Sequence, residues 1–176
     1  MKQLVKKYRI FILLFIVQII LMFALPEIGY KSLLNIRNNI KEMLGVIPPV
    51  FILLGLLDVW VDRQTMIKYT GSGSGVKGAL ISFLLGSAAA GPLYAAFPIV
   101  SMMLKKGSSL FNVFLFIGAW STTKIPMLTF EAGSLGVPFM AVRLIASIIG
   151  ITLIATAIDH SLSKEEKEEI YNTAIM

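Results

Sequence analysis

The sequence predicts an all-α membrane protein with about five membrane segments, two of them broken or re-entrant. Hydrophobic residues make up 56% of the 176 residues and charged residues only 15%, whereas soluble domains carry about 25% charged residues. The apolar residues also form long runs rather than alternating with polar ones. Because a spanning helix needs roughly 20 apolar residues, we expect a multi-pass protein whose main environment is the lipid bilayer.

The N-terminal third contains two expected membrane segments. The first covers about residues 8–25 and should end at Pro26, since proline does not continue a helix. Residues 31–42 mix leucine and isoleucine with lysine and arginine, which is typical of a short amphipathic helix at the interface, with a polar loop as the alternative. A second segment begins near residue 43, and Pro48-Pro49 should kink it or delay its start.

Two later segments are each interrupted by small or polar residues. Residues 78–104 contain no charge, and as one helix they would extend about 40 Å, against a hydrocarbon core of about 30 Å. A break within residues 86–92 would resolve the excess, as a re-entrant hairpin or as a broken span. Residues 110–130 contain a polar interruption at 121–124, after which Pro126 opens a second half.

These breaks predict a solute site. Non-helical backbone survives at membrane depth only against protein or a water-filled cavity. Proline suits the first turn of a new helix, whose N-terminus would offer free N–H groups and a positive dipole end. Discontinuous helices of this kind form the substrate sites of secondary transporters. The candidate substrate-binding residues are Gly86, Ser87, Gly91, Pro92, Ser121, Thr122, Thr123, Lys124 and Pro126.

Lys124 carries most of the functional argument. A lysine within a span is costly and marks a functional site by default, here for an anionic or strongly polar solute. Alternatively, Lys124 snorkels to an interface or pairs with Glu131 or Asp58. The hydroxyls of residues 121–123 can instead bond to the preceding helical turn, and the small residues 86–91 can instead serve close helix packing.

Three ionisable residues are candidates for ion or proton coupling, namely Asp58, Glu131 and Arg143. Asp58 and Asp62 are spaced to share one helix face, where they could handle a cation or proton or simply mark a solvated helix end. Arg143 lies inside the last apolar run, where it could be paired, snorkel to the headgroups or face a cavity.

Several classes of site are not expected. The chain has no cysteine and one histidine, His160, so we expect no metal site and no cofactor. It also lacks a histidine dyad, a paired catalytic aspartate motif and a Gly-x-Ser-x-Gly elbow, so we expect no enzymatic activity. The net charge of +6 comes from basic residues that flank apolar runs. That placement is typical of topology signals and lipid contact rather than of nucleic-acid binding.

The order of these features resembles a known family. Residues 88–127 read AAAGPLYAAFPIVSMMLKKGSSLFNVFLFIGAWSTTKIPM. This stretch is similar to the bacterial predicted permeases that include the organoarsenical efflux permeases, and the similarity covers roughly residues 75–160. It implies a permease of the bacterial inner membrane. Family members often carry Cys-x-Cys-Gly where residues 88–91 are Ala-Ala-Ala-Gly, so thiolate ligation of an arsenical is not expected.

Full-length members of that family look like two related halves, and this chain is the size of one half. We expect a single permease half over residues 1–160 and a charged cytoplasmic or peripheral tail over 161–176. The half would act by alternating access as a homodimer or higher homo-oligomer, as in an inverted-repeat transporter. The alternative is a membrane scaffold or assembly subunit that binds no solute.

Charge counts bear on the orientation of that dimer. With five spans, the Lys and Arg residues outside the spans divide seven against seven between the two sides. Because Lys/Arg asymmetry sets orientation, the balance predicts dual topology and an antiparallel pair. A hairpin at residues 78–104 would make the count nine against five.

Overall fold

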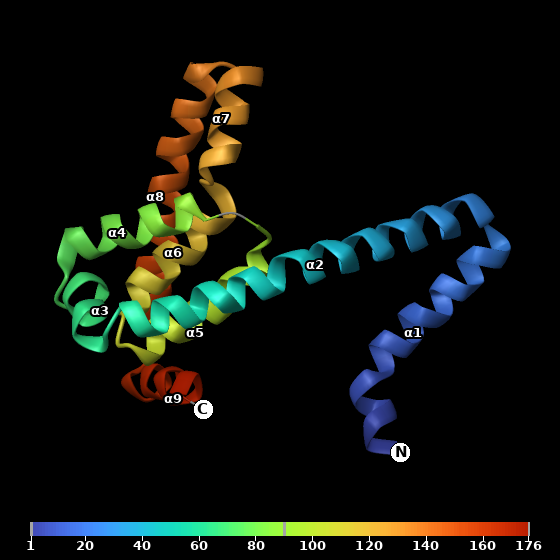
Figure 1. Ribbon diagram of the computed structural model, residues 1–176, viewed down its shortest axis with the longest axis horizontal. Coiled ribbons are helices and arrows are strands. Elements are labelled where there is room, and N and C mark those ends of the chain that lie inside the picture. Colours follow the sequence, from blue (N-terminus) through green and yellow to red (C-terminus); the bar gives the residue numbers. More distant parts are fainter. Residues whose placement is uncertain (1, 90, 176) are drawn as a thin grey trace. The chain divides into compact units, whose positions relative to one another are not determined.

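The computed structural model is helical throughout the part of the chain that it describes, and Figure 1 gives the order of the helices. It describes the backbone of residues 2–89 and 91–175, with their side chains except those of residues 2–7, 54, 57, 58 and 175. The chain divides into two compact units, residues 1–48 and 49–176.

The first unit is a helical pair held together by one polar side chain. α1 (Lys2–Ala24) ends before Pro26, and α2 (Pro26–Trp60) begins with that proline in its first turn. Gln18 on α1 donates to the Gly29 carbonyl at 3.0 Å and accepts from the Ser32 hydroxyl at 2.7 Å. The single polar residue of the first apolar run therefore joins α1 to α2.

α2 corrects two expectations. Residues 31–42 are helical but do not form a separate interfacial helix, because α2 continues unbroken from Pro26 to Trp60. Pro48-Pro49 does not delay or interrupt it, although the boundary between the two compact units falls between these prolines. Helices in membrane proteins tolerate such prolines because neighbouring groups and small local adjustments satisfy the freed backbone carbonyls.

The second unit contains a helical hairpin. α3 (Arg63–Thr70) leads into α4 (Gly75–Ala88), and after a break the chain returns through η1 (Leu93–Ala95) and α5 (Ala96–Lys105). The Ser109 N–H donates to the Thr70 carbonyl at 2.8 Å, and the hydroxyls of Thr70 and Ser108 lie 2.7 Å apart. Both ends of the hairpin therefore lie together, so residues 78–104 fold back on themselves, as the hairpin arrangement expected.

The chain then extends away from that end and comes back. α6 (Leu110–Thr122) is followed by α7 (Ile125–Ser134), and α8 (Val137–Ser161) returns alongside both. By length and composition, residues 110–134 and 137–161 can each cross a membrane, and shorter apolar helices lie at 8–24, 75–88 and 93–105. The all-helical class is confirmed, whereas the number of spans remains a prediction.

Small residues allow α4 to lie directly on α6. Gly78, Ser82 and Gly86 recur every four residues on α4 and are buried. A Cβ atom on Gly78 would lie 2.8 Å from Asn112 Nδ2, and one on Gly86 would lie 2.9 Å from Ala119 Cβ. These contacts run in the same order along both helices, so α4 and α6 are parallel. Close approach through small residues is the usual packing of membrane helices.

α9 (Lys164–Ile175) packs against α5 at the end where the hairpin begins and ends. The Tyr171 hydroxyl donates to the Ser108 carbonyl at 2.9 Å, and Lys167 pairs with Asp159 of α8 at 3.0 Å. The charged tail is therefore a docked helix, which returns the C-terminal region to the start of α4 and α6.

Candidate functional site

The first break is at the tip of the hairpin. α4 ends at Ala88, and Ala89 is extended. Gly91 has a φ of +107°, a conformation that a residue with a Cβ rarely adopts. Pro92 is also extended, and helical structure resumes at Leu93. The break predicted within residues 86–92 is thus confirmed, although Gly86 itself lies inside α4 and packs against α6.

The second break separates α6 from α7. Thr123 leaves the helical region with a φ of −123° and a ψ of 33°, and Lys124 is extended with a ψ of 134°. Pro126 then lies in the first turn of α7, where its missing N–H costs nothing. The interruption predicted at residues 121–124 is therefore also confirmed.

The two breaks lie side by side. The Ser87 and Thr123 hydroxyls are 2.9 Å apart, and both side chains are buried. Thr123 also bonds to the Ala119 carbonyl of its own helix at 3.1 Å. Because α4 and α6 are parallel, this contact holds their C-terminal ends at the same level.

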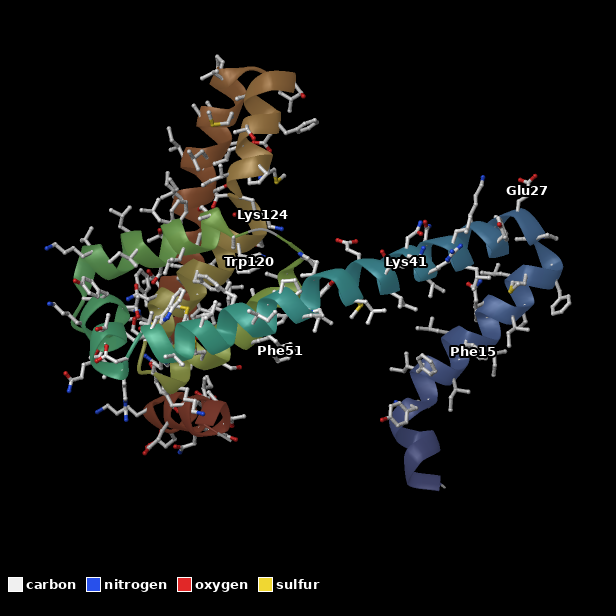
Figure 2. All side chains as sticks on the ribbon, in the orientation of Figure 1. Phe15, Glu27, Lys41, Phe51, Trp120 and Lys124 are labelled. Atoms are coloured by element: carbon white, nitrogen blue, oxygen red, sulfur yellow. The ribbon has the colours of Figure 1, made fainter. Side chains whose placement is uncertain are left out.

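The Gly91 carbonyl oxygen is the centre of the arrangement. Lys124 Nζ donates to it at 2.5 Å and Trp120 Nε1 donates to it at 3.3 Å. Figure 2 shows both side chains beside the hairpin tip. Trp120 is buried and packs edge-on against Phe116. Trp120 was not among the predicted site residues. Its position directly before the polar interruption, with one N–H donor on a large side chain, could have indicated it.

The electrostatics of the breaks differ from the expectation. The C-terminal ends of α4 and α6, not only helix N-termini, point into this region. Helix C-termini carry partial negative charge and attract cations. Lys124 therefore lies near the negative ends of α4 and α6 as well as at the positive end of α7, and it donates to a carbonyl oxygen. The ion pairs among the described residues do not include Lys124. The alternative in which Lys124 pairs with Glu131 is therefore wrong, and the Asp58 side chain lies outside the described residues.

Glu131 pairs instead with Arg143. Arg143 Nη1 lies 2.5 Å and 2.6 Å from the two carboxylate oxygens of Glu131. Arg143 Nη2 donates to the Thr122 carbonyl at 2.6 Å, on the last turn of α6. Glu131 is 5% exposed. This pair joins α7, α8 and the end of α6 immediately beside the second break.

The remaining hydroxyls of the site bond to the preceding helical turn, which was the alternative to solute binding. Ser121 and Thr122 both donate to the Gly118 carbonyl, at 2.9 Å and 2.8 Å. Ser121 is exposed and Thr122 is partly exposed. Their donors are occupied within the helix, but a hydroxyl oxygen retains lone pairs that can accept a hydrogen bond from a ligand or water.

Asp62 does not share a helix face with Asp58. α2 ends at Trp60, and Asp62 is the N-cap of α3, where it accepts from the Thr65 N–H at 3.0 Å. Hydrogen bonds from the Thr65 side chain and backbone lower the pKa of Asp62. Its role is to begin α3. Within the described residues, no three histidine, aspartate or glutamate side chains converge in a way that could hold a metal ion.

A family model matches most of the chain. The model of the ArsP_1 family, described as a predicted permease, matches residues 32–174. No curated protein and no solved structure matches the chain.

Proposed function

The chain belongs to the ArsP_1 family of predicted permeases, so it is a transport protein rather than an enzyme, and we propose that its solute binds where the two breaks meet. The site would comprise Lys124, the Gly91 carbonyl and the hydroxyl-bearing residues around them. The observation that carries the proposal is the contact between Lys124 and Gly91, which places a cationic side chain and a non-helical backbone at one point.

Helix lengths support a site within the bilayer. α4 has 14 residues and α6 has 13, which corresponds to about 20 Å at 1.5 Å per residue. The hydrocarbon core is about 30 Å thick. A break roughly two-thirds of the way across is at hydrocarbon depth, where non-helical backbone requires a protein or aqueous environment.

The chemistry favours a small anionic or strongly polar solute. In the structure Lys124 binds an uncharged carbonyl, and an anion would form a stronger, charge-assisted hydrogen bond with the ammonium. The oxygen of the exposed Ser121 could accept from a polar group of the solute. When Lys124 binds a solute instead of the Gly91 carbonyl, that carbonyl loses one of its two side-chain donors. Movement of the tip would then supply the change needed for alternating access.

Glu131 and Arg143 are the proposed coupling pair. Arg143 contacts both the carboxylate of Glu131 and the final carbonyl of α6. Protonation of Glu131 would weaken its attraction for Arg143 and thereby loosen α7 and α8 at the second break. Asp58 remains a candidate for the same role on sequence grounds.

Assembly is also proposed. The pairing of two copies in the bacterial inner membrane, as a homodimer or larger homo-oligomer, would complete the solute pathway. The competing scaffold function depended on small residues that offer a packing surface. Gly78, Ser82 and Gly86 are buried against α6 of their own chain, so they offer little surface to a partner, which favours transport.

A ligand screen tests the site. Thermal stability of the purified protein would be measured across a panel of organic and inorganic anions. Lys124→Met should abolish any stabilisation that the wild-type protein shows, and Lys124→Arg should retain part of it because the charge remains. An anion that stabilises wild-type and Lys124→Met protein equally would place the binding site elsewhere.

A further inference from the structure

The hairpin redistributes the basic residues of the second unit. From residue 49 onward the chain contains nine Lys and Arg residues, two of which, Lys124 and Arg143, lie at the second break. The re-entrant path brings residues 105 and 106 back to the end that holds α3, and α8 brings α9 to the same end. The seven basic residues at this end are Arg63, Lys68, Lys77, Lys105, Lys106, Lys164 and Lys167.

The opposite end is uncharged. The turn between α7 and α8 is formed by residues 135–136, and residues 132–142 around it contain no charged residue. The count within this unit is therefore seven against none. The balanced count expected from five simple spans does not apply here, because its premise, that Lys105 and Lys106 lie opposite Arg63, is wrong.

Four basic side chains at this end are exposed. Arg63, Lys68, Lys77 and Lys105 are exposed on α3, α4 and α5. Trp60 and Tyr69 lie among them in the sequence and are 73% and 46% exposed. Tryptophan and tyrosine are enriched at the headgroup level of membranes. Lys106 has a different role, because it is buried and donates to the Val61 carbonyl at 2.5 Å.

We infer that this end faces the cytoplasm in a single fixed orientation, and that Arg63, Lys68, Lys77 and Lys105 bind anionic lipid headgroups of the cytoplasmic leaflet. An excess of Lys and Arg marks cytoplasmic loops, and acidic residues contribute little to that rule. The cytoplasmic leaflet is negatively charged and attracts basic residues next to membrane segments. The acidic residues of α9 therefore do not reverse the orientation.

A fixed orientation does not depend on the solute site, but it limits how two copies of the chain can pair. A chain that inserts in one orientation does not form an antiparallel pair with itself. A homodimer would then be parallel, with both hairpins entering from the cytoplasmic side.

Reporter fusions to the C-terminus of the full chain test the orientation. We expect green fluorescent protein to fluoresce, because it folds in the cytoplasm, and alkaline phosphatase to be inactive, because it requires the periplasm. Active phosphatase, alone or together with fluorescence, would overturn the fixed cytoplasmic orientation.

Reconstitution tests the lipid contact. Thermal stability would be compared in nanodiscs of phosphatidylcholine with and without phosphatidylglycerol, at low and high salt. We expect phosphatidylglycerol to stabilise the wild-type protein at low salt. The triple variant K68Q/K77Q/K105Q should bind the anionic lipid more weakly, by about five-fold for each charge removed, and the matched K68R/K77R/K105R variant should behave as wild type. Equal stabilisation of the glutamine variant would refute lipid binding at these residues.

Discussion

The pair of Glu131 and Arg143 makes an asymmetric prediction. The Glu131 side chain is 6% exposed, whereas the Arg143 side chain is 25% exposed. Arg143→Met leaves a buried carboxylate without its cation, and breaking a buried pair in this way costs about 3–5 kcal/mol. Glu131→Gln leaves an arginine that still reaches solvent and still donates to Thr122, so its cost should be about 1–2 kcal/mol.

Two further variants make the comparison quantitative. Glu131→Gln combined with Arg143→Met should be more stable than Arg143→Met alone, because no uncompensated carboxylate remains. Lys167→Met is the control, since it breaks the Asp159 pair whose side chains are 28% and 31% exposed. Exposed pairs contribute only about 0–1 kcal/mol, so this variant should be close to wild type.

Unfolding in mixed micelles with increasing sodium dodecyl sulfate, followed by tryptophan fluorescence, measures these differences. Trp120 lies on the last turns of α6, close to the carbonyl that Arg143 binds, and reports on this region. If Arg143→Met were no less stable than Lys167→Met, the reasoning from burial would be refuted. The same conclusion would follow if the double variant lost the sum of both single effects.

Three further predictions concern packing, capping and titration. Gly86→Ala should destabilise the protein by about 1–3 kcal/mol because the new Cβ meets α6. Gly55→Ala is the control and should not destabilise it, because a Cβ there meets nothing within 4 Å. Equal denaturation curves for the two variants would contradict this prediction. Ser109→Ala should cost about 1 kcal/mol, because Ser109 caps α6, and an unchanged unfolding midpoint would argue against the cap. Burial raises the pKa of Tyr171 above its usual 10.0. The docked α9 should therefore be fully stable below pH 10. It should lose stability as pH rises above 10, because the undocked phenol ionises more readily than the docked one. The difference in tyrosinate absorbance between wild type and Tyr171→Phe isolates this phenol from the other four tyrosines. The loss of stability from undocking of α9 should be absent in Tyr171→Phe.

Much of the site could be predicted from local chemistry. A run of 27 residues without charge is too long for one span, and small residues next to proline indicate where it breaks. The same logic located the break at residues 121–124. These features depend on a few neighbouring residues and on bilayer thickness, so the sequence contains them directly.

Other features depend on contacts between distant residues. The partner of Lys124 is the carbonyl of Gly91, and a backbone acceptor leaves no trace in composition. The parallel arrangement of α4 and α6 follows from the return of α5, and only that arrangement brings two helix C-termini to the breaks. The same return moved Lys105 and Lys106 to the other side of the charge count. The sequence of residues 78–104 alone does not distinguish a hairpin from a broken span.

If the two breaks form a solute site, water should reach it. The chain has no native cysteine, so single cysteines can be introduced without background and labelled with a membrane-impermeant methanethiosulfonate reagent. Ser121→Cys, at the second break, is the test position. Ile149→Cys on α8 is the control. Ile149 is 55% exposed on an apolar face. It lies close in sequence to Ile151, which contacts Gly118 of α6, so Ile149 is at a level similar to that of Ser121. We expect rapid labelling of Ser121→Cys, slowed by an anion that stabilises the protein, and little labelling of Ile149→Cys. A Ser121→Cys variant as unreactive as Ile149→Cys would contradict the claim.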